Sequence, residues 1–341
     1  MNTTQNLSMG EGNTPLVSLQ TLARKWGMQK IWAKAEYLNP TGSYKDRIAR
    51  TTMLEALSQG CRGWLGTSSG NGGAAMSAYG ARAGLPGILC IIATAPAEKV
   101  ASIKPYGVLM IPMLDLGPAD MLALKKIAEE ENLLLTITAY AFNPEGMKGA
   151  ESIGEEISTH GSVSHVYLPT GGGGLLVATA IGLARGGSAA KVICAQPDEC
   201  SPIAQTVMGT IAQPNISTCT TKISGLQLAN PPDGDLAVEK INASNGWGVR
   251  VTDEAAWQMQ DVLAREEGVF VEPAAALALA GLYQDIQSGK VTSSDEPVVV
   301  LTGSGLKDMT RYKPTSPSIS FDIGQVGKLV KESLSTKGVS E

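Results

Sequence analysis

The 341-residue chain is long enough for two α/β domains or one large one, and it can bury a sizeable core. Hydrophobic residues make up 43% of it and charged residues 17%, a composition typical of a compact enzyme rather than of a disordered or fibrous chain. The formal net charge of -5 argues against nucleic acid or an anionic membrane as the main partner, because both bind basic surfaces. A small metabolite is therefore the expected ligand.

Targeting segments and metal ligands are not expected either. No apolar run reaches the length of a membrane span, and the N-terminal residues lack the basic and apolar regions of a signal peptide, so we expect a cytoplasmic protein. The five cysteines are odd in number and form no CxxC pair, which argues against a disulfide framework or a zinc site. Two histidines are too few to favour a histidine triad or a metal cluster.

From residue 60 onward, short apolar runs alternate with helix-like segments. The runs in the first half cover 63–67, 87–93, 108–113 and 133–138, and the segments between them are rich in alanine, leucine, lysine and glutamate. The pattern resumes with a run at 164–170, a helix from about 174, a run at 191–197, a helix opened by Thr252 as N-cap, and a run at 297–303. This alternation predicts βαβ units and a mainly parallel, twisted sheet in an α/β fold.

Residues 210–235 are rich in Pro, Thr, Asn and Asp and predict a long functional loop. A last helix is expected near 325–335.

Four glycine-containing stretches follow predicted strands, and each has two readings. The stretch 66–84 turns through Ser68 to Gly72 into a helix, which forms either an anion site at the helix N-terminus or an ordinary serine-capped turn. The four glycines Gly171 to Gly174 lack Cβ atoms, so their N–H groups can converge on a phosphate, although no P-loop sequence follows.

The other two stretches carry polar side chains next to predicted strands. Thr302 ends an apolar run, where open α/β sheets bind ligands, and Ser304 follows it. Glu272 precedes Pro273, a favoured first helical residue, so it either caps a helix or takes part in chemistry.

Lys45 stands in "EYLNPTGSYKDRIAR", between a glycine-containing turn and the start of a helix. Alone, it would be read as a solvated surface charge. A lysine amine, a phosphate cup, an asparagine in an anion loop and a hydroxyl at a strand end together suit pyridoxal 5'-phosphate, whose aldehyde needs an amine and whose phosphate needs backbone donors.

Five ordered motifs resemble those of the fold type II pyridoxal-phosphate enzymes, and among these the threonine synthases most. The motifs are "GNTPL" (12–16), "EYLNPTGSYKDR" (36–47), "SSGNGGAA" (68–75), "GVFVEPAAA" (268–276) and "LTGSGLKD" (301–308). The resemblance implies two open twisted sheets flanked by helices. It also implies a large cofactor-binding domain of residues 1–51 and 146–320, a small mobile domain of residues 52–145, a C-terminal helix or tail of residues 321–341, and a homodimer.

The same resemblance implies roles for individual residues. Lys45 would form the Schiff base and then act as the proton-transferring base. Asn71 would bond the 3'-hydroxyl of the ring, Gly171, Gly172, Gly173 and Gly174 would hold the phosphate, and Thr302 would face the pyridine nitrogen. The substrate carboxylate would bind at Ser68, Ser69, Gly70 and Gly72, and Lys99 could meet an anionic substrate.

Several positions depart from the threonine synthase pattern. Gly146 stands where an arginine for the substrate phosphate is expected, Gly72 replaces threonine, Ser304 replaces histidine, Ala275 replaces serine, and "TGGGG" replaces an asparagine-containing loop. The glycine loop is closer to that of dehydratases and cysteine synthases.

The predicted function is therefore a pyridoxal-phosphate-dependent lyase or synthase of amino-acid biosynthesis, with O-phosphohomoserine as the leading substrate. The alternatives are β-elimination on serine or threonine, and β-replacement on O-phosphoserine or O-acetylserine that yields cysteine, cysteate or diaminopropionate. From another class, the chain could be a non-catalytic module that binds the cofactor or an amino acid. A nicotinamide dehydrogenase would need a GxGxxG fingerprint that is not found.

Overall fold

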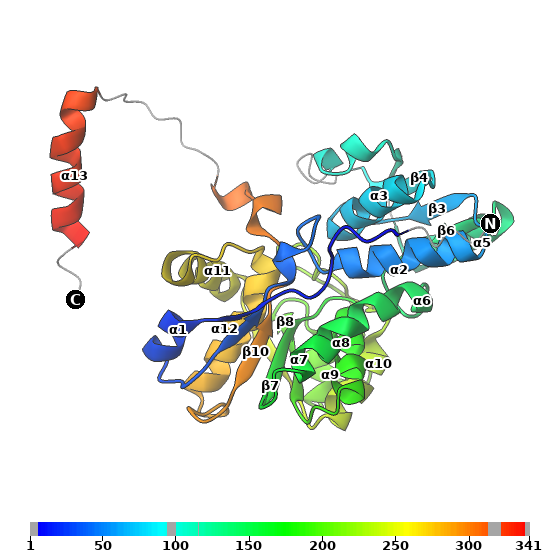
Figure 1. The fold of residues 1–341 in the computed structure, drawn as a ribbon. Helices are drawn as coiled ribbons and strands as arrows, with labels where there is room; N and C mark the ends of the chain where they lie inside the picture. The colour runs from blue at the N-terminus through cyan, green and yellow to red at the C-terminus, as the bar shows by residue number, and fades with distance from the viewer. Residues whose placement is uncertain (1–5, 94–99, 115, 313–321, 338–341) are drawn as a thin grey trace. The chain divides into compact units, whose positions relative to one another are not determined.

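The computed structural model describes residues 6–93, 100–114, 116–312 and 322–337. The chain divides into two units, Met1–Asp308 and Met309–Glu341 (Figure 1). The second unit contains the short 3-10 helix η5 (Thr310–Tyr312) and α13 (Ile323–Lys337), so the expected C-terminal helix is present.

The first unit contains a six-stranded sheet that is parallel except at one edge. Its strand order is β1-β2-β10-β7-β8-β9, and only the β1–β2 pair is antiparallel. The strands are β1 (Leu16–Ser18), β2 (Trp32–Lys34), β7 (His165–Pro169), β8 (Lys191–Pro197), β9 (Trp247–Val251) and β10 (Pro297–Val300).

Both faces of this sheet are buried, as expected for parallel strands. Along β10 the side chains alternate, so that Val298 and Val300 pack into one core cluster and Val299 and Leu301 into the other. Helices cover each face (Figure 1): α1 (Gln20–Lys25), α11 (Asp253–Glu267) and α12 (Pro273–Gln287) on one side, and α7 (Ser152–Ser158), α8 (Gly174–Arg185), α9 (Pro202–Val207) and α10 (Gly234–Ala243) on the other.

A second sheet, of four parallel strands, is built from residues 63–135. Its order is β5-β4-β3-β6, with β3 (Gly63–Gly66), β4 (Gly87–Ile92), β5 (Leu109–Met113) and β6 (Leu133–Leu135). The other helices with described bounds in this unit are α2 (Lys45–Ser58), α3 (Asn71–Ala83), α5 (Pro118–Glu130) and α6 (Pro144–Met147), with the 3-10 helices η1 (Glu36–Leu38), η2 (Lys104–Tyr106), η3 (Lys148–Glu151) and η4 (Gly305–Lys307). The expected fold, two twisted sheets flanked by helices, is confirmed.

Local signals in the sequence match several element ends. The Thr252 side chain accepts a hydrogen bond from Ala255 N and caps α11, as the sequence predicts. No apolar run in the sequence predicts β1, β2 or β9. Strands β1 and β2 have only three residues each, and in β9 the apolar residues alternate with Gly248 and Arg250. Strand β6 is shorter than the run 133–138, because Ala139 N donates to Ile137 O and turns the chain. The helix expected over 97–107 lies partly outside the described residues.

No described helix combines the length and the apolar character that a membrane crossing requires.

The irregular segment 208–233 is attached to the end of β8 by a disulfide between Cys200 and Cys219, whose Cα atoms lie 4.8 Å apart. The cysteine count argues against a disulfide framework, and that expectation is wrong for this pair, whereas Cys90 and Cys194 are buried and free. The odd number and wide spacing concealed the pair, because the two cysteines meet only through the path of the loop.

Replacing both Cys200 and Cys219 by serine should lower the free energy of unfolding by about 3 kcal/mol, because a closed loop of this length restricts the unfolded chain. Urea denaturation of the oxidised protein and of the double variant measures the difference. Cys61→Ser, at a free cysteine, is the matched control and should leave stability unchanged. Equal stability of the wild type and the double variant would contradict the prediction.

Candidate active site

Lys45 is the first residue of α2, and the loop before it is fastened to the end of β10. Gly42 adopts φ +84°, and its carbonyl accepts a hydrogen bond from Ser304 N at 2.9 Å. Tyr44 N donates to Thr302 O at 3.1 Å. The sequence-predicted residues Lys45 and Thr302 therefore lie on adjoining segments.

A buried ion network anchors the same end of α2. The Arg47 guanidinium binds the Glu36 carboxylate in a bidentate manner, at 2.8 and 2.7 Å, and also binds Glu156 at 2.5 and 2.8 Å. Burial raises the pKa of Glu156, but hydrogen bonds and charge from Arg47 and Lys34 outweigh it and hold that pKa at about 2. Arg47 is 3% exposed and Glu36 is 0% exposed, so a buried ion pair fixes the first turn of the helix that Lys45 begins.

The Lys45 amine has one hydrogen-bond partner among the described residues. Its Nζ donates to Thr138 Oγ1 at 2.7 Å and lies 4.6 Å from the centroid of the Tyr44 ring. No carboxylate in the part of the chain that the structure describes forms an ion pair with it. The amine therefore has further N–H groups, or a lone pair when it is deprotonated, with which it can bind a ligand.

Thr138 links three of the predicted segments, although the sequence analysis did not single it out. A Cβ atom on Gly72 would lie 3.9 Å from Thr138 Cγ2, and one on Gly174 would lie 3.5 Å from Thr138 O. Lys45, the Ser68–Gly72 turn and the glycine loop therefore meet around this one residue. Its position just after β6, at the carboxyl end of a parallel strand, is the signal that could have identified it.

The turn from Ser68 to Gly72 leads from β3 into α3. Gly70 is the N-cap of α3, and its N–H donates to Ser68 Oγ at 3.3 Å. A Cβ atom on Gly70 would meet nothing within 4 Å, so this backbone borders open space, and Ser69 beside it is half-buried. The turn therefore places the N-terminus of α3 beside open space, and its binding of an anion stays a prediction.

Asn71 lies at the first position of α3 and meets Glu272. Its Nδ2 donates to Glu272 Oε2 at 2.7 Å, whereas its buried Oδ1 has no hydrogen-bond partner. Glu272 is the N-cap of α12 but makes no side-chain capping bond, and its backbone N donates to Gly303 O at 3.0 Å. Glu272 therefore orients Asn71 against the segment that carries Thr302, and the capping interpretation of its side chain is wrong.

The glycine loop connects β7 to α8. Gly173 has φ +92°, and the N–H groups of Gly171, Gly172 and Gly173 form no hydrogen bond with any described residue. A Cβ atom on Gly171 would lie 2.5 Å from Gly225 O, so the irregular segment 208–233 forms one wall of this loop. The loop therefore has N–H donors that no described residue uses, and its phosphate-binding role stays a prediction.

Asp233 fastens the glycine loop to the segment that carries Thr138, and the sequence gives little signal for it. Its carboxylate accepts hydrogen bonds from Tyr140 N at 2.8 Å and Ala141 N at 3.0 Å, and its backbone N donates to Gly172 O at 3.0 Å. Burial raises the pKa of Asp233, and the two N–H donors and the charge of Lys45 oppose that rise. The turn-forming "NPPDGD" sequence predicts only a turn at this position.

Two predicted substrate positions remain. Lys99 lies outside the described residues. Gly146 is buried in α6, and a Cβ atom there would lie 2.2 Å from Thr52 Oγ1 and 2.4 Å from Asn143 Nδ2. The space of an arginine side chain at this position is therefore occupied by Thr52 and Asn143. Among the described residues, no cluster of histidine, cysteine, aspartate or glutamate could hold a metal ion.

Sequence comparison identifies relatives along most of the chain. The chain is 33% identical over 307 residues to the threonine synthase of Halalkalibacterium halodurans, which covers 89% of this chain and 84% of that protein. It is 32% identical over 317 residues to the threonine synthase of Methanosarcina acetivorans, which covers 89% of this chain and 76% of that one.

Solved structures share the fold. Maize serine racemase has a TM-score of 0.74 at 22% identity and covers 96% of this chain and 94% of its own. An O-ureido-L-serine synthase has a TM-score of 0.72 at 21% identity and covers 93% of this chain and 97% of its own.

A family model described as pyridoxal-phosphate dependent enzyme matches residues 7–303, which include Lys45, Asn71, the glycine loop and Thr302. Because that match spans most of the sequence and agrees with the threonine synthase relatives, the chain belongs to the pyridoxal-phosphate dependent enzymes, with the fold type II architecture.

Proposed function

We propose that this chain is a pyridoxal-phosphate-dependent lyase that acts on the side chain of an L-amino acid in the manner of threonine synthases, converting O-phosphohomoserine to threonine and phosphate. The observation that carries the proposal is the Lys45 amine, which is hydrogen-bonded to Thr138 where the Ser68–Gly72 turn and the glycine loop meet. A protein that only bound an amino acid would not need an amine at this point.

The residues around Lys45 fit the family's cofactor. The free N–H groups of Gly171 to Gly173 suit its phosphate, the unpartnered Oδ1 of Asn71 suits its 3'-hydroxyl, and the Thr302 hydroxyl suits its pyridine nitrogen. When bound, the cofactor supplies an aldehyde that reacts with amines and a ring that stabilises negative charge at the substrate Cα. A neutral partner such as Thr302 moderates that ring and suits elimination and replacement reactions.

The protein side chains would divide the remaining work. The Lys45 amine would hold the cofactor, and Lys45 Nζ would then take the proton from the substrate Cα. Thr138 accepts the Lys45 hydrogen bond and would keep Nζ in position. Ser68, Ser69 and the backbone at Gly70 and Gly72 would bind the substrate carboxylate, and Lys99 would meet an anionic group. We further propose that residues 52–145 close over the substrate as a mobile domain against 1–51 and 146–320, to exclude water.

The threonine synthase relatives support O-phosphohomoserine as the substrate. A second candidate is β-elimination on serine or threonine, or β-replacement on an activated serine, and Gly146 is the observation that favours it. Its surroundings leave no room for the expected arginine, so a substrate phosphate would depend on other donors. A cytoplasmic homodimer is the assembly that the family resemblance supports.

The decisive experiment is turnover by the cofactor-loaded protein with O-phosphohomoserine, O-phosphoserine, serine and threonine, followed by assays for phosphate, ammonia and 2-oxo acid. We expect phosphate and threonine from O-phosphohomoserine, without 2-oxo acid. Ammonia and 2-oxo acid from serine or threonine, with no phosphate release, would assign the dehydratase reaction instead. Absence of turnover with every substrate would support a non-catalytic module.

Lys45→Ala should abolish the visible absorbance of the lysine-bound cofactor and lower turnover by roughly 1,000-fold, because both the attachment and the base are lost. Absorbance spectra of the dialysed protein and steady-state rates measure the two effects. Lys148→Ala, at an exposed lysine outside the site, is the control and should change neither. A Lys45→Ala protein that kept the absorbance and full turnover would refute the proposal.

Asp233→Asn should weaken cofactor binding about 10-fold, because an amide has one acceptor oxygen for two N–H donors and loses a charge-assisted bond worth about 1.5–3 kcal/mol. Titration of the apoprotein with pyridoxal phosphate, followed by absorbance, gives the dissociation constant. Asp235→Asn, two residues further on and exposed, should bind the cofactor normally. Equal affinities for the wild type and Asp233→Asn would show that Asp233 does not support the glycine loop.

A further inference from the structure

A cavity lies beside the loop that precedes Lys45. Its volume is about 390 Å³, within the range of about 300–1,000 Å³ typical of small-molecule sites. The lining comes from η1 and the loop before α2, the first turn of α3, the region of η2, and the segment of η4 that follows β10, with the residues Tyr37, Asn39, Pro40, Thr41, Gly42, Ala74, Ser102, Tyr106, Ser304 and Lys307. We call it the Lys307 pocket.

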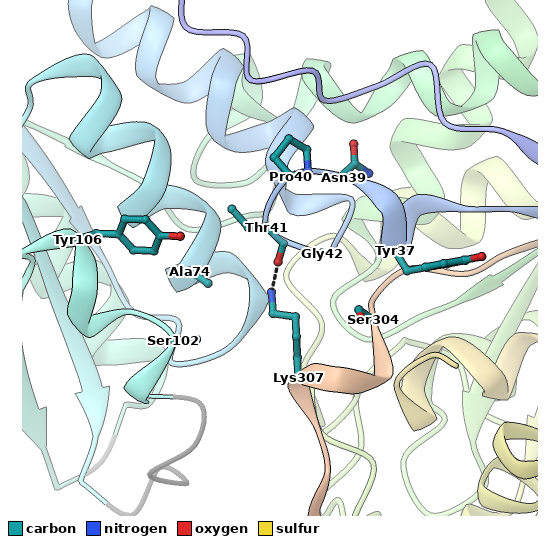
Figure 2. Close-up of a pocket in the computed structure, with 10 residues that line it drawn as sticks. All are labelled: Tyr37, Asn39, Pro40, Thr41, Gly42, Ala74, Ser102, Tyr106, Ser304 and Lys307. Carbon is teal, nitrogen blue, oxygen red and sulfur yellow. Dashed lines mark hydrogen bonds between the residues drawn. The ribbon is translucent and has the colours of Figure 1, made fainter. Parts of the chain in front are cut away.

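The pocket is separate from the proposed catalytic site. Lys45, Asn71, Thr302 and the glycine loop are not among its lining residues. Figure 2 shows Tyr106, Ala74 and Ser102 on one side of the pocket, and Lys307 reaching toward Thr41 between them and Tyr37. The proposed catalytic groups therefore do not account for the pocket.

Lys307 carries a charge that no described carboxylate neutralises by contact. Its Nζ makes one hydrogen bond, to Thr41 O at 2.8 Å, and forms no ion pair within the described residues. Burial lowers the pKa of Lys307, and the more distant charges of Glu272 and Asp46 only partly restore it. An ammonium group in this state gains from an anionic ligand, because a charge-assisted hydrogen bond would replace lost hydration.

The nearby carboxylates are already engaged elsewhere. Asp46 accepts hydrogen bonds from Thr41 N at 2.6 Å and from Thr41 Oγ1 at 2.5 Å, and burial raises its pKa to about 6. Glu272 accepts the hydrogen bond from Asn71. Neither forms an ion pair with Lys307, so the positive charge is available to the pocket.

The other polar lining groups suit a phosphate. Ser102, Tyr106 and Ser304 carry hydroxyls of the kind that bind phosphate oxygens, whereas the Thr41 hydroxyl already donates to Asp46. We propose that the Lys307 pocket binds a small phosphate-bearing molecule, with Lys307 as the charged contact and these hydroxyls as neutral ones.

Occupancy of the pocket would act on the loop before Lys45. Thr41 donates to Asp46, the residue after Lys45, and accepts from Lys307, so an anion that draws Lys307 away releases one of the two attachments of Thr41. A ligand in the Lys307 pocket would therefore change the position of the proposed catalytic Lys45 through the loop before α2, without contact with the substrate.

Titration of the cofactor-loaded protein with inorganic phosphate and, separately, with phenyl phosphate tests the proposal by calorimetry. Loading with cofactor first fills the glycine loop, so that this loop does not contribute a phosphate site. We expect saturable binding of at least one of the two probes. Tighter binding of phenyl phosphate would assign the pocket to a phosphate monoester that packs on the tyrosines, whereas equal affinities would assign it to free phosphate.

Two variants identify the site of binding. Lys307→Met removes the charge and keeps an apolar stem, whereas Ser102→Tyr fills the pocket from an exposed position and keeps the charge. Each should weaken phosphate binding at least 10-fold, with Lys126→Met, at an exposed lysine of α5, as the control of unchanged affinity. The proposal is overturned if the wild type does not bind either probe, or if both variants bind as tightly as the wild type. Ser102→Tyr decides the question should Lys307→Met fail to fold.

Discussion

The position of Lys45 depends on a buried ion network centred on Arg47, two residues further along α2. Arg47 joins Glu36, before the loop, to Glu156 in α7, so removal of Arg47 would leave the fully buried Glu36 carboxylate without its cation. A buried network of this kind is costly to form and therefore specific in geometry. It fixes the beginning of α2, and with it the loop 39–44, to the sheet that carries β10. The backbone of Lys45, the first residue of α2, is therefore held in a fixed position.

The site assembles at the carboxyl ends of parallel strands from both sheets. The Ser68–Gly72 turn follows β3, Thr138 follows β6, the glycine loop follows β7 and Thr302 follows β10. Loops at this edge of a parallel sheet lie side by side, so residues far apart in sequence reach one volume. Glu272 and Asp233 support two predicted residues, since Glu272 accepts a hydrogen bond from Asn71 and the Asp233 N–H donates to Gly172 O. The Lys307 pocket is lined in part by residues 39–42, in the loop before α2.

Much of the fold could be predicted because strong local patterns specify it. Apolar runs bounded by turns predicted seven of the strands, and the N-cap at Thr252 predicted the start of α11. Strands β1 and β2 escaped prediction because three residues make no pattern, and they form only by pairing with β10 and each other. Asp233 and Thr138 escaped because an aspartate in a turn and a threonine after a strand are common, and their partners are 93 residues away in each case. The Cys200–Cys219 disulfide escaped for the same reason, since only the path of 208–233 brings the two together.

The sequence by itself determined the α/β class, the glycine loop, the lysine at the start of α2 and, through ordered motifs, membership of the pyridoxal-phosphate dependent enzymes. These features are encoded in short stretches, where local propensity and the absence of Cβ atoms act directly. Only the tertiary structure decided which acceptor holds the Lys45 amine, which carboxylates support Asn71 and the glycine loop, and that Thr52 and Asn143 occupy the space beside Gly146. Those outcomes depend on packing and on hydrogen bonds between segments distant in sequence. The separation of two residues in the sequence does not determine how far apart they lie in the folded protein.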